Sequence, residues 1–169
     1  MASNTRNLRH GSLVVKDGAG TPKVLQFKIE EGNLSFSESR PGVVVKHRGG
    51  LDHWSKGEEQ ETSVSWSFKF VEWGSKSTAA LSTSDSTCSP RDFLMGTFAG
   101  LTTTSGRTDV FTTTLVFSIS NPMSSGDEAE ALTFTQFKCE SIAFSEAADA
   151  NVMAASGRAL VIVPTSARS

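Results

Sequence analysis

The side chains best suited to chemistry are three histidines and two cysteines, and their spacing does not favour catalysis. His47 and His53 lie in one glycine-bearing stretch with Asp52 between them, which could start a metal site. Zinc sites in proteins use three or four ligands at characteristic spacings, and no further ligand stands near these residues in the sequence. We therefore expect exposed histidines here, with no metal and no cofactor.

Motifs for nucleophilic catalysis and nucleotide binding are missing. The sequence has no Gly-x-Ser-x-Gly, no Walker loop and no Gly-x-Gly-x-x-Gly. Asp92 and Asp109 show no spacing that would pair them as general acid and base. The glycines at 18–20 and 49–50 fall in turns rather than before helices, so they do not predict a phosphate cradle. We predict that the protein is not an enzyme.

Cys88 and Cys139 form no Cys-x-x-Cys motif, and the N-terminus MASNTRNLRH lacks the apolar core of a signal peptide. Disulfides persist mainly in oxidising compartments. We therefore expect two reduced thiols, Cys139 in a sheet and Cys88 in a loop. No apolar run approaches the roughly 20 residues of a membrane span. These features predict a protein that resides, or is assembled, in the cytoplasm.

The elements that must position any functional surface are strands. The clearest is Thr62–Trp73, TSVSWSFKFVEW, in which serines and a lysine separate large apolar residues. Side chains of a strand point alternately to opposite faces, so this run has one apolar and one polar face. We expect it to be the central strand of an antiparallel sheet, with these side chains in the core: Val64, Trp66, Phe68 and Phe70.

Alternation and turn residues predict six to eight further strands, chiefly 12–16, 24–29, 34–37, 43–46, 109–120, 131–145 and 158–163. Within 131–145 the apolar positions change parity, which predicts a bulge or a strand that passes from one sheet to another. Ser89-Pro90 starts the one helix we expect, with Gly96 or Gly100 ending it. The predicted fold is mainly β, an antiparallel β-sandwich or barrel with one short flanking α-helix.

The predicted domain organisation is simple. Residues 1–11 form a flexible arm, 12–164 a single β-sandwich domain, and 165–169 a loose tail. A long charged loop, 47–61, interrupts the domain and carries Trp54. Loops of this length are often functional. Trp54 either packs on a neighbouring chain or folds back over the core of its own subunit.

The formal net charge is -2 over 169 residues, which argues against a dedicated nucleic-acid binder. Residues 1–56 hold 9 Lys and Arg against 5 Asp and Glu, and residues 57–169 hold 7 against 13, so the two parts carry +4 and -6. One interpretation is an ordinary mixed soluble surface. The other is a subunit with one basic and one acidic end, suited to head-to-tail stacking.

The first part of the chain resembles the tail tube proteins of long-tailed bacteriophages, which are related to the tube protein of type VI secretion. The resemblance is carried by a polar arm, an opening strand GSLVVKDG, a second strand closing on EEGNLSF, a glycine-bearing stretch and TSVSWSFKFVEW. It covers about residues 4–73, and the remainder matches only by its strand pattern. It rests on this pattern and not on diagnostic residues.

The resemblance implies a structural virion protein. Subunits of that family form hexameric rings, which stack into the tail tube through which the genome passes. It implies copies of this chain and other tail proteins as partners, no specific DNA binding, and a place in the virion tail. Expected contacts between subunits involve Arg6, Arg9, Arg48, Leu51, Asp52, His53, Trp54 and Lys56.

Two other functions fit the same strand pattern. One is a small β-sandwich module that binds carbohydrate through exposed aromatic side chains such as Trp54 and Trp73. The other is a different virion part, such as a head–tail joining protein.

Overall fold

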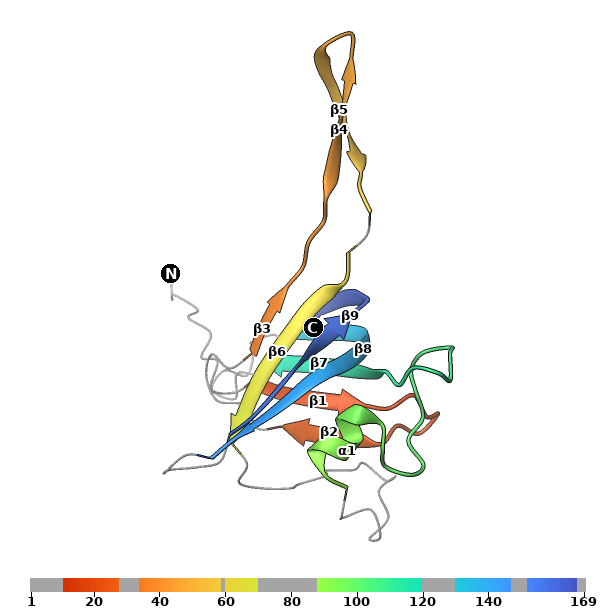
Figure 1. Ribbon diagram of the computed structural model, residues 1–169, viewed down its shortest axis with the longest axis vertical. Helices are drawn as coiled ribbons and strands as arrows, with labels where there is room; N and C mark the ends of the chain where they lie inside the picture. The colour runs from red at the N-terminus through yellow and green to blue at the C-terminus, as the bar shows by residue number, and fades with distance from the viewer. Residues whose placement is uncertain are drawn as a thin grey trace.

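The structure is a computed structural model that describes residues 11–27, 34–58, 60–69, 88–119, 130–146 and 152–166. It is an antiparallel β body with a short helix at its side and a two-stranded hairpin that projects far from it (Figure 1). This confirms the predicted mainly β fold with one short helix. No helix in the described ranges is long and apolar enough to span a membrane.

The described residues form ten strands. Seven of them follow one another in the body sheet in the order β2-β1-β7-β8-β9-β6-β3, and β10 pairs with β8. β4 and β5 form the separate hairpin. The strands are β1 Gly11–Lys16, β2 Val24–Phe27, β3 Leu34–Ser37, β4 Gly42–His47, β5 Gly50–Lys56, β6 Thr62–Lys69, β7 Thr113–Ile119, β8 Glu130–Ser145, β9 Val152–Ala159 and β10 Val161–Ser166.

The long strand β8 belongs to both halves of the body. Its first half pairs with β7 and β10, and its second half pairs with β9. Between them Gln136 has a positive φ of 49°, and the register shifts against both β7 and β9. The parity change predicted within 131–145 is therefore confirmed, because the strand passes from one sheet to the other at this point.

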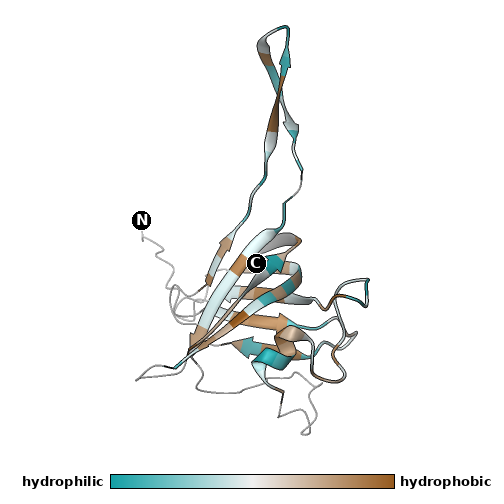
Figure 2. Ribbon diagram, in the orientation of Figure 1, coloured by the Kyte–Doolittle hydropathy of each residue, from teal (hydrophilic) through white to brown (hydrophobic). Residues whose placement is uncertain are grey.

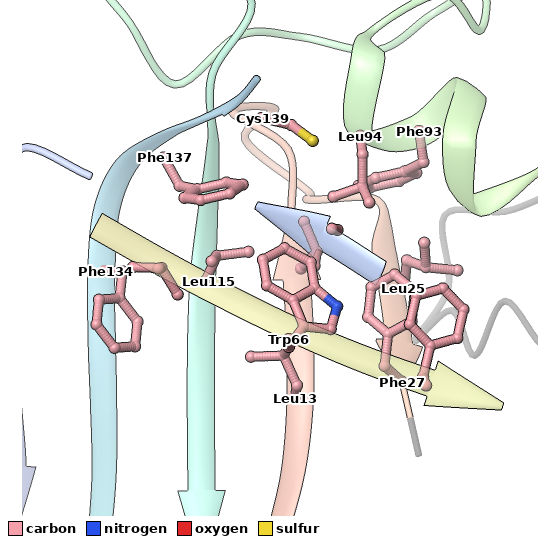
Figure 3. Close-up of a cluster of buried hydrophobic side chains, with 14 of the residues drawn as sticks. Leu13, Leu25, Phe27, Trp66, Phe93, Leu94, Leu115, Phe134, Phe137 and Cys139 are labelled. Atoms are coloured by element: carbon pink, nitrogen blue, oxygen red, sulfur yellow. The ribbon is translucent and has the colours of Figure 1, made fainter. Parts of the chain in front are cut away.

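The core lies between these two halves. β6 contributes Val64, Trp66 and Phe68, all at most 6% exposed, while Ser63 and Ser65 on its opposite face are exposed. Figure 3 shows that Trp66 lies among side chains of the opposite half and of the helix. Aromatic rings fill this space, with centroids 4.5 Å apart for Phe27–Phe68, 5.4 Å for Trp66–Phe137 and 6.0 Å for Phe27–Trp66.

The helix α1, Pro90–Met95, begins and ends as its sequence predicts. The Ser89 hydroxyl accepts a hydrogen bond from the Asp92 amide at 3.0 Å, which satisfies one of the free N–H groups of the first turn. Gly96 ends the helix in the left-handed conformation, at a φ of 69°. Phe93 and Leu94 are buried and attach the helix to the core.

Three predicted strand bounds need correction. The last strand, expected at 158–163, is two strands, β9 and β10, separated at Leu160. Pro164, which we expected to end that strand, lies within β10; among the described strands β10 pairs only with β8, and a residue without an N–H is tolerated at a sheet edge. The strand expected from 109 begins only at Thr113.

Some predictions fall outside the described residues. These are the arm at 1–10 with Arg6 and Arg9, the core position Phe70, and Trp73.

Candidate functional site

The most exposed apolar side chains lie on the β4–β5 hairpin. The prediction of a loop over 47–61 is wrong, because Gly50–Lys56 forms the second strand of the hairpin. A two-residue turn connects the strands, with Arg48 at a φ of 49° and Gly49 at 83°. Positive φ at both central residues is the geometry of the tight turns that match the twist of paired strands. Six residues of β4 extend about 20 Å at roughly 3.3 Å per residue.

A bulge decides which side chains share a face of the hairpin. Val44 pairs with Trp54 and Lys46 pairs with Leu51, while the register shifts between Val45 and Lys46, at Asp52. Without the shift, two residues three positions apart would point to opposite faces. The bulge places Leu51 and Trp54 on the same face. We call Val44, Leu51 and Trp54 the apolar hairpin face.

This face is open to solvent. Trp54 is 74% exposed and Leu51 is 78% exposed, so Trp54 does not fold back over the core of its own subunit. Its ring lies over Gly42, where a Cβ atom would come within 2.9 Å of a ring carbon. The absence of a side chain at Gly42 therefore lets the indole lie flat along the hairpin. In Figure 2 hydrophobic colour appears on β4 well away from the body.

The hairpin is basic. Between Gly42 and Lys56 it carries three cations, Lys46, Arg48 and Lys56, against one carboxylate, Asp52, which gives +2. Asp52 contacts His53, with 2.8 Å between Oδ2 and Nδ1. Exposed pairs of this kind contribute little to stability. The described part of the chain holds no group of three or more side chains able to ligate a metal.

The predicted interface residues within the described ranges all lie on this hairpin. Arg48 is at its turn, Leu51 to Trp54 are in the middle of β5, and Lys56 is at its end. The sequence signal that could have revealed the hairpin is the apolar run Val43-Val44-Val45. After the two turn residues Arg48 and Gly49, a second short strand segment begins at Gly50. The polar composition of GLDHWSK concealed that second strand.

A second feature is a serine-covered outer face of β3, β6, β9 and β8. Register places Ser35 beside Ser65, Ser65 beside Ser156, and Ser156 beside Ser141. Neighbouring rows add further small residues, and a shallow recess of about 290 Å³ lies over this face. Its small side chains are Ser35, Ser37, Ser63, Ser65, Ser67, Ser141, Ser156, Ala143 and Ala154.

Arg158 of β9 connects to Glu140 of β8 and to Glu61, the residue before β6, at one end of this face. Its guanidinium contacts the carboxylates of Glu140, with Nε 2.9 Å from Oε1, and Glu61. The pKa of Glu140 is lowered chiefly by the hydrogen bond from Arg158. The pKa of Glu61 is lowered by a backbone hydrogen bond and then by Arg158. The pKa of Arg158 is raised by the same two carboxylates.

Beside Arg158 lies a recess of about 350 Å³ with mainly apolar walls, which we call the Leu160 recess. Leu160 stands at the break between β9 and β10 and is 59% exposed. Leu160 also borders a second recess, of about 310 Å³, at the base of the hairpin. The Leu160 recess is lined by Val110, Thr112, Ala159 and Leu160, with Arg107, Lys138 and Arg158 among the charged residues at its rim.

The two cysteines offer no reactive site. Cys139 lies buried in β8 as predicted, and burial raises the pKa of its thiol to about 11. A thiol with a raised pKa is a poor nucleophile at neutral pH. Cys88 is buried just before α1.

Comparison by sequence found no matching family model and no matching curated protein. Comparison by structure found chains of contractile injection systems. A chain of the PVC sheath–tube complex of an extracellular contractile injection system, in the extended state, aligns with a TM-score of 0.58 and 12% identity. That alignment covers 98% of this chain and 94% of that one.

Two further matches come from the anti-feeding prophage (AFP). A chain in the structure of its tube terminating cap has a TM-score of 0.57 and 11% identity, over 99% of this chain and 95% of that one. A chain in the structure of its baseplate has a TM-score of 0.54 and 10% identity, over 98% and 97%. The likeness covers nearly the whole of each chain. This chain therefore has the fold of components of contractile injection particles.

Proposed function

We propose that this protein is a tube subunit that assembles with copies of itself into stacked hexameric rings. The tube is that of a phage tail or of a related injection particle, and it serves as the conduit for genome or cargo delivery. The observation that carries this proposal is the apolar hairpin face. Its Leu51 and Trp54 are about three-quarters exposed on an element that projects from a body with its own closed core.

Large exposed apolar patches on a soluble chain mark interaction sites. Burying a large apolar side chain contributes about 1.5–3 kcal/mol. A ring repeats the same contact at every subunit, so a modest contribution from Trp54 and Leu51 is multiplied around the assembly. A hairpin that docks on a different surface of the next copy is a head-to-tail contact, the type that builds rings and tubes.

The comparison with solved structures supports the same proposal. The matching chains come from structures described as a sheath–tube complex, a tube terminating cap and a baseplate. Their fold extends over 98% or more of this chain. By analogy, partners at the ends of the tube would be other tail proteins, and the subunits would assemble in the cytoplasm of the host.

The serine-covered outer face suits the wall of such a conduit. Its central row, Ser35, Ser65, Ser156 and Ser141, is short and neutral across four strands, and the charged residues Arg158 and Glu140 stand at one end of the face. DNA binds proteins largely through cations that neutralise its phosphates. A wall of serine and alanine would let DNA pass without specific binding.

The test is negative-stain electron microscopy of the purified protein over a concentration series. Hollow rings or striated tubes are expected. Trp54→Ala should abolish them while the subunit keeps its far-ultraviolet circular dichroism spectrum. The matched control is Val43→Ala, because Val43 is also exposed, at 56%, but lies on the opposite face of the hairpin.

A particle that remains a monomer at every concentration would contradict the proposal. The exposed indole of Trp54 would then favour a carbohydrate-binding module, which a glycan titration followed by tryptophan fluorescence would detect.

A further inference from the structure

The apolar hairpin face needs a receiving surface, and its own subunit does not supply one. Trp54 and Leu51 remain 74% and 78% exposed in the folded chain, so neither occupies a recess of the body from which the hairpin projects. None of the described residues of the same chain covers this face, so we look to another molecule for the receiving surface. A second copy of this chain is the partner to consider first, because the proposed function already requires contacts between copies.

The Leu160 recess has the properties that such a surface requires. It holds about 350 Å³ behind mainly apolar walls, and Leu160 at its edge is 59% exposed. An exposed leucine beside an empty apolar recess gains contacts when an apolar side chain enters. Aromatic residues that fill pockets of this kind are the usual energetic centres of protein interfaces.

The rim of the recess carries charges of both signs, as the hairpin does. Arg158 forms ion pairs with Glu61 and Glu140, whereas no ion pair within 4 Å joins Arg107 or Lys138 to another described residue, and Lys138 acts on Glu140 only from a greater distance. Asp52 is the one carboxylate of the hairpin and lies between Leu51 and Trp54. Lys46 pairs with Leu51 and so lies on the apolar hairpin face, while the recess is lined by the carboxylates Glu61 and Glu140 as well as by the cations. Both surfaces thus carry both signs of charge, and pairing of Lys46 with a rim carboxylate and of Asp52 with a rim cation would fix the orientation.

We propose that the apolar hairpin face of one copy docks in the Leu160 recess of the next copy, with Trp54 as the anchor. This inference rests on the proposed function, and it names the contact by which one subunit holds another. The two surfaces differ, so the contact is head-to-tail. Every copy then offers one free hairpin and one free recess until a ring closes or a stack ends.

The first test combines two single variants. Trp54→Ala disables the hairpin and Leu160→Arg disables the recess, and each variant alone should sediment as a monomer in analytical ultracentrifugation. Each should raise the concentration needed for assembly by roughly tenfold to a hundredfold or more. Mixed one to one, they should form dimers and nothing larger, because only one intact hairpin and one intact recess remain per pair.

The controls are Val43→Ala on the opposite face of the hairpin and Thr108→Arg. Thr108 is exposed and neighbours Arg107, but it is not among the residues that line the recess. Both controls should assemble like the unmodified chain. If Leu160→Arg also assembles like the unmodified chain while Trp54→Ala does not, the recess is not the receiving surface. The proposed function would survive that result.

A cross-linking test does not depend on the folding of Leu160→Arg. Leu51→Cys in one preparation and Leu160→Cys in another should form a disulfide between copies on mixing under mild oxidation. The native Cys88 and Cys139 are buried, which keeps them from competing. Val43→Cys mixed with Leu160→Cys is the control and should remain uncross-linked. Equal cross-linking in both mixtures would overturn the proposed orientation.

Discussion

Two tryptophans on β5 and β6, which follow one another in the chain but do not pair, have opposite environments. Trp66 is 2% exposed between the two halves of the body, and Trp54 is 74% exposed on the hairpin. β6 has a strand on each side, β3 and β9, and a layer of apolar side chains over one face. The hairpin has one pair of strands, none of whose residues is buried, and no layer of described residues covers it. The same residue type stabilises the fold in one region and is available for assembly in the other.

This contrast shows that the number of neighbouring strands, more than the residue type, decides the role of an apolar side chain. An isolated two-stranded hairpin is at best marginally stable in water. A hairpin that carries unburied tryptophan and leucine therefore gains most when another molecule covers it. If burial decides the role, substitutions in the body should lower the free energy of unfolding, and substitutions on the apolar hairpin face should leave it almost unchanged.

The largest effect on stability is expected for Trp66→Ala. Removing a fully buried aromatic ring leaves a cavity and should lower the free energy of unfolding by about 3–5 kcal/mol. Chemical denaturation of the monomer measures this loss. Ser65→Ala at the adjacent exposed position is the control and should change little. A loss below about 1 kcal/mol for Trp66→Ala would mean that the core does not depend on β6.

A smaller effect is expected for Gly157→Ala. A Cβ atom there would lie 2.0 Å from the carbonyl oxygen of Lys138, where β9 passes the irregular part of β8. Overpacking of this kind costs about 1–3 kcal/mol. Gly20→Ala is the matched control, because nothing lies within 4 Å of its added atom. Equal thermal midpoints for the two variants would contradict the predicted close packing of β8 against β9.

The carboxylates around Arg158 should give a weak dependence on pH. The folded pKa values of Glu61 and Glu140 are lowered, so their stabilising contribution is complete above the ordinary glutamate pKa of 4.5. It is lost as the pH falls below that value and through the folded pKa values. In Arg158→Gln the pKa of Glu140, measured by nuclear magnetic resonance, should rise toward 4.5. An unchanged pKa would show that Arg158 does not hold it.

The smallest effect on folding is expected for Leu51→Ser. Leu51 is 78% exposed, and surface substitutions usually change the free energy of unfolding by less than about 0.5 kcal/mol. Assembly followed by light scattering should nevertheless fall. A clear loss of monomer stability would contradict the contrast between the core and the hairpin, because it would show that the apolar hairpin face contributes to the fold.

The sequence was informative where one local pattern determined the structure. Alternation predicted the buried face of β6, Ser89-Pro90 predicted the start of α1, and a change of parity predicted the passage of β8 between sheets. In each case a period of two or a capping residue acts over a few positions. Such patterns are readable without knowledge of the partner strand.

The hairpin could not be predicted in the same way. β5 alternates poorly because the bulge at Asp52 interrupts its period, and none of its residues is buried. Its existence depends on pairing with β4 and on the positive φ of Arg48, which a non-glycine residue rarely adopts. The Leu160 recess was equally hidden, because it brings together residues from 61, 105–112, 136–140 and 158–160.

The connection of the hairpin to the body has a mechanical consequence. The hairpin follows β3 and leads directly into β6, so a pull on it loads these two strands at adjacent ends. β6 is paired with β9 along all eight residues from Thr62 to Lys69. A force along β6 acts on this ladder in shear, so its hydrogen bonds resist together and do not open one after another. A subunit built in this way can transmit tension from a neighbour into β6 and its eight-residue ladder with β9 without unzipping.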